Sequence, residues 1–407
     1  MLVALACVFL AITATARADA PLTETAAVAL ALSRSALADV TDGRVALATA
    51  ERERVRRWPN PVVSFQHEEV EGQAGTSEDY AWLSQTFDLA GRRYIRADAA
   101  EHRVTAARAE GEGMLANRRA AVRERFYEAL LAQERAAAFA AWLEQGARIG
   151  RIIERRAHAG EASGYDRRRF EREVTTIRAR LATTEAELGR ARARLAGLIG
   201  ERDTPGTTWK MLAGPLRPGT DLPALADLLA RIPARPDLRG LLAMQGAAAL
   251  DQRAAGRWWL PDLTVGAGVK TVEAGGERLT GPFVSASLPL PLLDQDQGDA
   301  WEATARLRVS RGEYQLALDA AEAEIRGFWS ETAALTWAAA EFRRDTVEPS
   351  TALVDIAERA YQAGEMDLLG LVDAHRGALD VALQALALDL SARRAWIDLA
   401  RAAGGDL

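Results

Sequence analysis

The segment RWPNPVVSFQHEE occupies residues 57–69, and the related segment RWWLPDLTVGAGVK occupies residues 257–270. In both segments Arg-Trp comes before a proline, and the proline opens a run in which apolar and polar residues alternate. An alternation with a period of two predicts β-strands that have one apolar face. Because the pattern occurs twice, we expect the chain to consist of two related halves.

Each half contains a second alternating run, so we expect β-hairpins over about 61–89 and about 261–292, with loops at 72–77 and 274–281. Strands of this length fit either a soluble hairpin packed on one face or the strands of a transmembrane barrel. The residues expected on the apolar, lipid-facing side are Val63, Phe65, Leu83, Phe87, Leu263, Val265, Ala286 and Leu290.

Long helices follow each hairpin. Residues 91–159 contain no proline, and residues 297–363 contain only Pro349. A helix of about 65 residues is on the order of 100 Å long, so these two helices must pack side by side in a rod or tube. Return helices are expected over about 165–200 and 366–403, and further helices over about 25–58 and 237–258.

The return helices carry apolar residues at heptad spacing, which predicts coiled-coil packing against neighbouring helices. In the first half the seam consists of Phe170, Val174, Ile177, Leu181, Leu188, Leu195 and Leu198. In the second half it consists of Leu379, Leu383, Leu386, Leu390 and Ile397.

The predicted organisation starts with a secretory signal at 1–18, because an apolar stretch is followed by a small-residue cleavage site at Ala18. A membrane anchor is the alternative, but this apolar stretch is too short to span a bilayer. The first repeat then covers 19–203, an irregular belt covers 204–236, and the second repeat covers 237–407. The predicted fold class is mainly α with a β-barrel portion.

Composition excludes several classes of function. The net charge of −6 argues against nucleic-acid binding. The single cysteine, Cys7, lies in the predicted signal, and the four histidines have no ligand spacing, so we expect no metal site and no cofactor. We find no catalytic motif, and we expect the protein not to be an enzyme.

Four strands from one chain cannot close a barrel in lipid, where open sheet edges are not tolerated. Membrane strands would therefore require an oligomer. Two chains would supply eight strands, which side chains nearly fill, whereas three chains would supply twelve strands and leave a passage. The pattern favours a homotrimer.

The ordered motifs resemble the TolC-like outer membrane factors, and among them the heavy-metal CzcC-type branch. The resemblance is carried by Asn60-Pro61, by the segments at 83–93 and 287–294, by Gln297-Gly298, and by the Ala-Gly-Glu turns at 159–161 and 363–365. It covers essentially the whole mature chain.

The resemblance implies a trimer with a twelve-stranded barrel in outer membrane lipid and a helical tunnel in the periplasm. A periplasmic adaptor and an inner-membrane RND-type pump would be its partners. The adaptor would dock at a tip formed by Gly160, Glu161, Gly364 and Glu365. Asp373 matches a position of an acidic ring inside the tip. Gly370 stands where a second acid can occur, and Asp367 is a substitute candidate for that acid.

Three functions remain open at the level of sequence. The chain is an exit duct for divalent heavy-metal cations, a channel for drugs or a secreted polypeptide, or a periplasmic coiled-coil scaffold without a channel. Two smaller hypotheses accompany them. Trp58, Trp82, Trp258 and Trp259 form an aromatic girdle of the barrel or pack in a core, and Arg167-Arg168-Arg169 form a solvated face or contact an adaptor.

Overall fold

The computed structural model describes residues 21–70, 75–158, 163–201, 211–405 and 407. The chain forms two units. One combines the residues up to Leu37 with Leu115–Ala230 and Ala323–Leu407, and the other combines Ala38–Met114 with Arg231–Glu322. Each unit therefore contains segments of both sequence halves.

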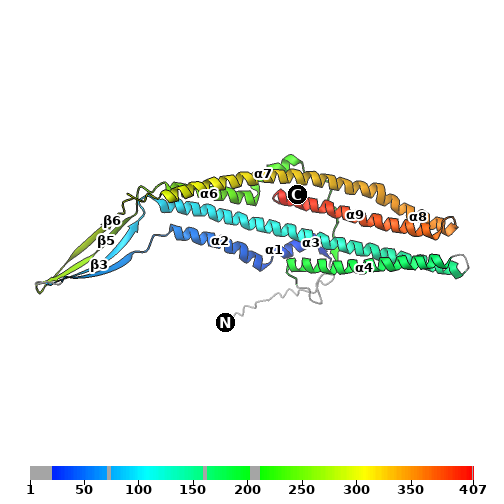
Figure 1. Ribbon diagram of the computed structural model, residues 1–407, viewed down its shortest axis with the longest axis horizontal. Coiled ribbons are helices and arrows are strands. Elements are labelled where there is room, and N and C mark those ends of the chain that lie inside the picture. The colour runs from blue at the N-terminus through cyan, green and yellow to red at the C-terminus, as the bar shows by residue number, and fades with distance from the viewer. Residues whose placement is uncertain (1–20, 71–74, 159–162, 202–210, 406) are drawn as a thin grey trace, which may run out of the picture. The chain divides into compact units, whose positions relative to one another are not determined.

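The second unit contains a four-stranded antiparallel sheet in the order β2-β3-β5-β6 (Figure 1). The strands are β2 (Val62–Val70), β3 (Thr76–Phe87), β5 (Leu263–Ala274) and β6 (Glu277–Ser287). Both predicted hairpins are present, and β3 pairs with β5 to join them. β2 and β6 form the two edges of this sheet.

The turn between β5 and β6 is shorter than the loop expected at 274–281. The strands continue to a turn at Gly275 and Gly276, whose φ angles are +60° and +86°. Only glycine adopts this left-handed backbone without strain, and two such residues make the tight turn that fits the twist of a hairpin. In the other predicted loop, residues 71–74 lie outside the described part of the chain.

Helices α2 (Ser35–Arg56), α6 (Pro236–Ala255) and the first parts of α3 (Arg92–His158) and α7 (Gln297–Phe342) complete the second unit. A single 3-10 turn at Ile232–Ala234 comes before α6. No residue of α2 is buried, and ion pairs attach this helix to α3.

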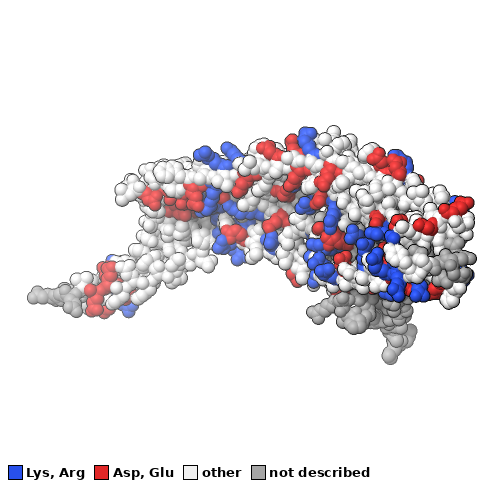
Figure 2. All heavy atoms as spheres, turned by 45° about the vertical axis from the view of Figure 1, so that its right-hand side comes forward, with Lys and Arg blue, Asp and Glu red and all other residues white. Residues whose placement is uncertain are grey.

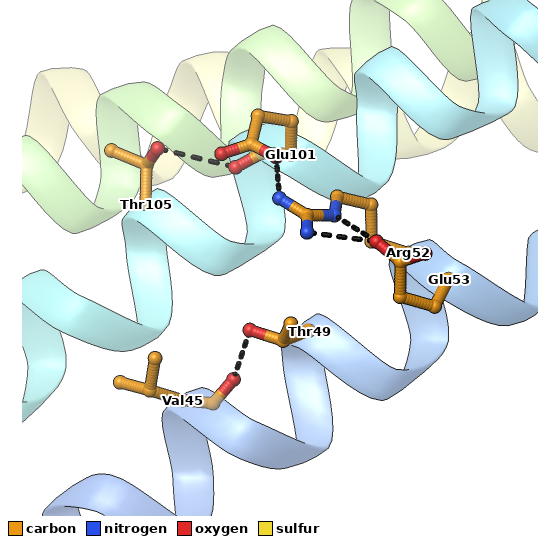
Figure 3. Close-up of polar contacts among 6 residues, drawn as sticks. All are labelled: Val45, Thr49, Arg52, Glu53, Glu101 and Thr105. Carbon is orange, nitrogen blue, oxygen red and sulfur yellow. Dashed lines mark hydrogen bonds and ion pairs between the residues drawn. The ribbon is translucent and has the colours of Figure 1, made fainter. Parts of the chain in front are cut away.

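Figure 3 shows the best defined of these ion pairs. Arg52 on α2 lies 2.6 Å from Glu101 on α3 and 2.8 Å from its neighbour Glu53. The hydrogen bond from Arg52 holds the pKa of Glu101 below its usual range. An exposed ion pair of this kind contributes little to the stability of a protein, because water screens the two charges. Packing in an assembly is therefore the expected source of stability for α2.

The first unit contains α1 (Glu24–Leu32), the remainder of α3, α4 (Gly164–Ile199), α5 (Leu225–Ala230), α8 (Glu348–Ala363) and α9 (Leu368–Ala402). Short strands β1 (Leu22–Thr23) and β4 (Leu212–Ala213) pair in parallel. The predicted single helix over 25–58 is divided, since α1 ends at Leu32 and α2 begins at Ser35. Arg34, between them, donates to the Gly197 carbonyl over 3.1 Å.

The heptad residues form the core of this unit. Phe139 and Trp142 of α3 pack with Ile177 of α4 and Leu379 of α9. A second cluster combines Ile149, Ile153, Phe170, Ala357, Tyr361, Leu371 and Val372. Four helices thus share apolar seams of the predicted kind.

The helix predicted over 297–363 is interrupted at Pro349. The α7 helix ends at Phe342, a π-helical segment covers Arg343–Val347, and α8 continues from Glu348. Proline has no N–H and its ring crowds the preceding turn, so the backbone before it widens into a π-bulge. The proline predicts the break, although the shape of the break needs the structure.

A buried ion pair lies at this π-helical segment. The Nε atom of Arg343 is 3.1 Å from Oδ2 of Asp389 on α9, and the Asp389 residue is only 1% exposed. The hydrogen bond to Asp389 raises the pKa of Arg343. Sequence reasoning missed this pair because Asp389 looks like an ordinary polar residue between two leucines. The belt expected at 204–236 is likewise not wholly irregular, since it contains β4 and α5.

Candidate channel site

One face of the four-stranded sheet is aliphatic and exposed. The register places Val63, Leu83, Ala267 and Val284 side by side on this face. One neighbouring row contains Phe65, Ala81, Val269 and Pro282, and the other contains Gln85, Val265 and Ala286. In the row beyond Gln85, Phe87 pairs with Leu263. Val63 is 79% exposed, Phe65 70% and Val284 75%. A contiguous apolar surface of this kind indicates contact with a membrane or a partner.

Seven of the eight residues predicted for the apolar side lie on this face. The eighth, Leu290, is exposed but follows the end of β6, so the ladder does not fix its orientation. From Phe87 to Ala81 the aliphatic rows extend about 20 Å along the strand, at about 3.4 Å per residue. The next row is polar and contains His67, 2.7 Å from Asp79. The band is close in height to the apolar belt of about 25 Å found on membrane barrels.

The opposite face of the sheet has another chemistry. Tyr80 and Trp82 lie there with Phe283, at ring-centroid distances of 5.3 and 5.4 Å from it. Lys270 lies 2.8 Å from Glu78 and 4.9 Å from the Tyr80 ring centre. Trp82 therefore does not share a face with Val63 and Leu83. If those residues face lipid, Trp82 cannot belong to the lipid-facing girdle considered from sequence.

Trp58 is better placed for a girdle. It lies at the helical end of the aliphatic band, where its ring centroid is 5.9 Å from that of Phe87. The Arg93 guanidinium lies 3.7 Å from the centre of the Trp58 ring. Trp58 and Trp259 are exposed. An aromatic ring beside a cation at the margin of an apolar band is typical of a membrane–water interface.

The four residues predicted for the adaptor-docking tip fall into two pairs. Gly160 and Glu161 lie outside the described residues. Gly364 ends α8 with a φ of +80°, and its N–H and that of Glu365 are bonded back to the carbonyls of Tyr361 and Ala360. Glycine is needed there because this left-handed cap strains any residue that has a Cβ atom.

The two gate candidates are not equivalent. Asp367 is the N-cap of α9, and its Oδ1 atom accepts a hydrogen bond of 2.8 Å from the Gly370 N–H. Asp373 is exposed and lines a groove with Ile356 and Met366. A side chain at Gly370 would meet Met366 at 3.0 Å and Asp367 at 3.3 Å. A side chain at position 370 would therefore require Met366 and Asp367 to shift.

His375 is a residue that sequence reasoning missed. It is 3% exposed, and its Nε2 atom lies 3.1 Å from Oε1 of Glu358 without the alignment of a hydrogen bond. Burial lowers the pKa of His375, with a smaller opposing effect from Glu358 and a further lowering from Arg148. The signal in the sequence is its place on the seam, four residues from both Leu371 and Leu379.

The two helical hairpins of the first unit, α3–α4 and α8–α9, carry opposite net charge near their turns. Residues 144–180, on α3 and α4, contain ten arginines and six carboxylates, whereas residues 348–380 contain two arginines and seven carboxylates. In Figure 2 blue atoms gather over the region where α4 lies. Arg167 and Arg168 are exposed, and Arg167 lies 3.6 Å from Glu171. The described part of the chain contains no group of acidic, histidine and cysteine residues arranged to hold a metal ion.

Within the described residues, no helix combines the length and the apolar character needed to cross a membrane.

No family model matches the sequence. A relative in sequence is the cobalt-zinc-cadmium resistance protein CzcC of Cupriavidus metallidurans, which is 28% identical over 375 residues, covering 88% of this chain and 84% of CzcC.

Solved structures with the same fold include three outer-membrane channels. The channel OprN has a TM-score of 0.75 and 20% identity, covering 94% of this chain and 90% of that one. CmeC of Campylobacter jejuni has a TM-score of 0.74 and 16% identity, with coverage of 94% and 85%. CusC has a TM-score of 0.73 and 17% identity, with coverage of 94% and 92%. These likenesses establish the fold, a helical barrel combined with barrel strands, as expected from the sequence.

The solved structures OprN and CmeC are outer-membrane channels, in line with the prediction that this protein is not an enzyme. The chain is thus similar to CzcC in sequence and to these outer-membrane channels in fold, in agreement with the resemblance to TolC-like outer membrane factors and their CzcC-type branch that the sequence motifs indicated.

Proposed function

We propose that the protein is the outer-membrane exit duct of a tripartite efflux system that exports divalent heavy-metal cations. The observation that carries the proposal is the four-stranded sheet with an exposed aliphatic face and two open edges. Lipid is the solvent that such a face fits, and open edges are excluded from lipid unless another chain pairs with them.

A homotrimer is the assembly proposed to close these edges. Three copies supply twelve strands, which is enough to leave a passage through the barrel. The long helices of α3 and α7 continue from the strands and would form the periplasmic tube. A periplasmic adaptor is proposed to dock at the tip near Gly364 and Glu365, and an RND-type pump to deliver the cargo.

The proposed cargo rests on two observations. The relative CzcC is named for resistance to cobalt, zinc and cadmium. In addition, α8 and α9 place an excess of carboxylates at the tip, where Asp373 is exposed. In a trimer, three copies of a carboxylate around a narrow axis attract cations and repel anions.

Gene deletion tests the cargo. We expect the deletion strain to accumulate cobalt, zinc or cadmium and to become sensitive to them, with no change toward dyes and antibiotics. Sensitivity confined to dyes and antibiotics would instead assign the duct to drug export. Complementation with the intact gene is the control.

Fractionation tests the channel itself. The protein should be recovered with outer membranes and should produce discrete conductance steps in a planar bilayer. Recovery in the soluble periplasm, with no conductance, would support the coiled-coil scaffold instead.

A further inference from the structure

The face of the sheet opposite the aliphatic band changes abruptly in side-chain size along the strands. Near the helices its rows contain mostly small residues, first Thr86, Thr264 and Ser287 and then Ser84, Gly266 and Ser285, with Val62 at the edge of the second row. The next row contains Trp82 and Phe283 on either side of Gly268, and the row after that contains Tyr80 and Lys270. The change from small to large takes place within two residues on β3, from Ser84 to Trp82, and on β6, from Ser285 to Phe283.

The three aromatic rings converge over one glycine. Trp82 and Tyr80 both lie against Phe283, at 5.4 and 5.3 Å between ring centroids. A Cβ atom on Gly268 would lie 2.5 Å from Cβ of Trp82 and would overlap the Ala81 carbonyl. A Cβ atom on Gly266 would lie 3.0 Å from the Trp82 ring and 2.5 Å from Oγ of Ser285. Gly266 therefore leaves room for the Trp82 indole, and Gly268 allows β5 to lie close to the β3 backbone at Ala81 and Trp82.

Charged groups adjoin the cluster on its far side from the helices. Lys270 lies 2.8 Å from Glu78, and the Tyr80 hydroxyl donates to Glu78 over 2.5 Å. These contacts with Glu78 restrain the side chains of Tyr80 and Lys270. The Trp82, Tyr80 and Phe283 rings are thus fixed in place between strands β3, β5 and β6.

We propose that Trp82, Tyr80 and Phe283 form an aromatic constriction in the lumen of the barrel, which limits the size of solutes that enter the duct from outside. This inference rests on the proposed function, because the aliphatic face must meet lipid for the aromatic face to line the lumen. Three copies in a trimer would place nine rings in two adjacent rows of the wall. The constriction would be separate from any gate at the helical tip.

Cysteine labelling in intact cells tests this constriction. Ser84→Cys places a thiol on the lumenal face, on the helical side of the Trp82 row. Wild-type cells report the background, because the only native cysteine is Cys7. Two reagents are compared, a small charged maleimide and the same maleimide attached to a long polyethylene glycol chain.

We expect the small reagent to label Ser84→Cys and the long reagent to give only the wild-type background. Adding Trp82→Ala or, independently, Phe283→Ala should raise labelling by the long reagent to the level of the small one. Leu83→Ala, on the opposite face of the same strand, is the matched control and should leave the exclusion intact. Equal labelling by the long reagent with and without the aromatic rings would overturn the constriction.

A second thiol separates failure of this inference from failure of the proposed function. Glu277→Cys lies beside the turn between β5 and β6 and should react with both reagents if the hairpin reaches the cell surface. If Glu277→Cys stays unlabelled, the outer-membrane placement of the sheet is wrong. If it is labelled while Ser84→Cys resists both reagents in every background, the outer-membrane placement stands and the lumenal position of this face is wrong.

Discussion

At the scale of single residues, the carboxylates of Asp373, Asp367 and Asp389 have different surroundings. Asp373 is exposed beside Ile356 and has no ion pair among the described residues, so its charge is free to act on passing ions. Asp367 is engaged in capping α9, and Asp389 is enclosed with Arg343. Exposure and hydrogen bonding therefore distinguish carboxylates that look alike in the sequence.

Asp373→Asn should lower the preference of the channel for cations. The substitution keeps the size of the side chain and removes three charges from a trimer, so the attraction for cations near the axis weakens. The measurement is the reversal potential in a planar bilayer under a salt gradient. Asp355→Asn, an exposed carboxylate on α8, is the matched control, and unchanged selectivity in Asp373→Asn would remove this residue from the pore.

The Arg343–Asp389 pair should show an asymmetric response to substitution. Arg343→Met leaves a buried carboxylate without its partner, which is expected to cost about 3–5 kcal/mol of unfolding free energy. Asp389→Leu should cost less, because the Arg343 side chain is 38% exposed and retains contact with water. Denaturant unfolding followed by helical circular dichroism gives both values. Equal losses would show that Asp389 is hydrated in solution.

At the scale of elements, the helices of the tip contain a pH-sensitive position. His375 on α9 faces Glu358 on α8 and Arg148 on α3, and burial lowers its pKa below the ordinary value of 6.5. At a pH between the folded and unfolded pKa values, His375 is protonated in the unfolded chain and neutral in the folded tip. The contribution of His375 to stability is complete above about pH 6.5 and is lost as the pH falls toward the lower folded pKa.

His375→Leu should weaken this pH dependence. We expect the unfolding midpoint of the wild type to decrease as the pH is lowered from 7 to 5. The midpoint of His375→Leu should decrease less over the same range. The comparison with His158→Leu, at the exposed end of α3, controls for losing a histidine. If both variants follow the wild-type curve, His375 does not titrate in this range.

The sheet offers a test of which face meets lipid. Val63→Lys, on the aliphatic face, should destabilise the assembled barrel by about 2–4 kcal/mol if its position is near the middle of the bilayer. Ser64→Lys, on the adjacent residue and the opposite face, should be tolerated. Resistance of the assembly to detergent at rising temperature reports the difference. The reverse order of effects would exchange the lipid and lumenal faces.

The sequence predicts these elements unevenly. Alternation at Val63 and Phe65 predicts the strand face because a period of two leaves only one arrangement. Heptad spacing predicts the seam through Ile177 and Leu379, because residues seven apart lie on the same face of a coiled-coil helix. The seam position of His375 indicates its burial, whereas the burial of Asp389 was not predictable, since it depends on which neighbouring helix covers it. The place of Trp82 depends on the register with Gly268, which no local pattern specifies.

At the scale of the whole molecule, the number of chains follows from strand count. Detergent-solubilised protein should have a mass near three times the 44.0 kDa of the full chain, less any leader that is removed. Mass photometry after subtraction of the detergent gives this number. A mass of two chains would limit the barrel to eight strands, which side chains nearly fill, and the duct would be excluded.

The open edges of β2 and β6 also bear on how the protein reaches its destination. The helices can form from local contacts, whereas the sheet gains its last partners only when other copies arrive. A newly exported single chain would therefore expose an apolar sheet with two unpaired edge strands to water. Assembly without aggregation would then require either a chaperone that covers this sheet or very rapid association of the copies. A slow supply of partners would turn the same strands into sites of aggregation.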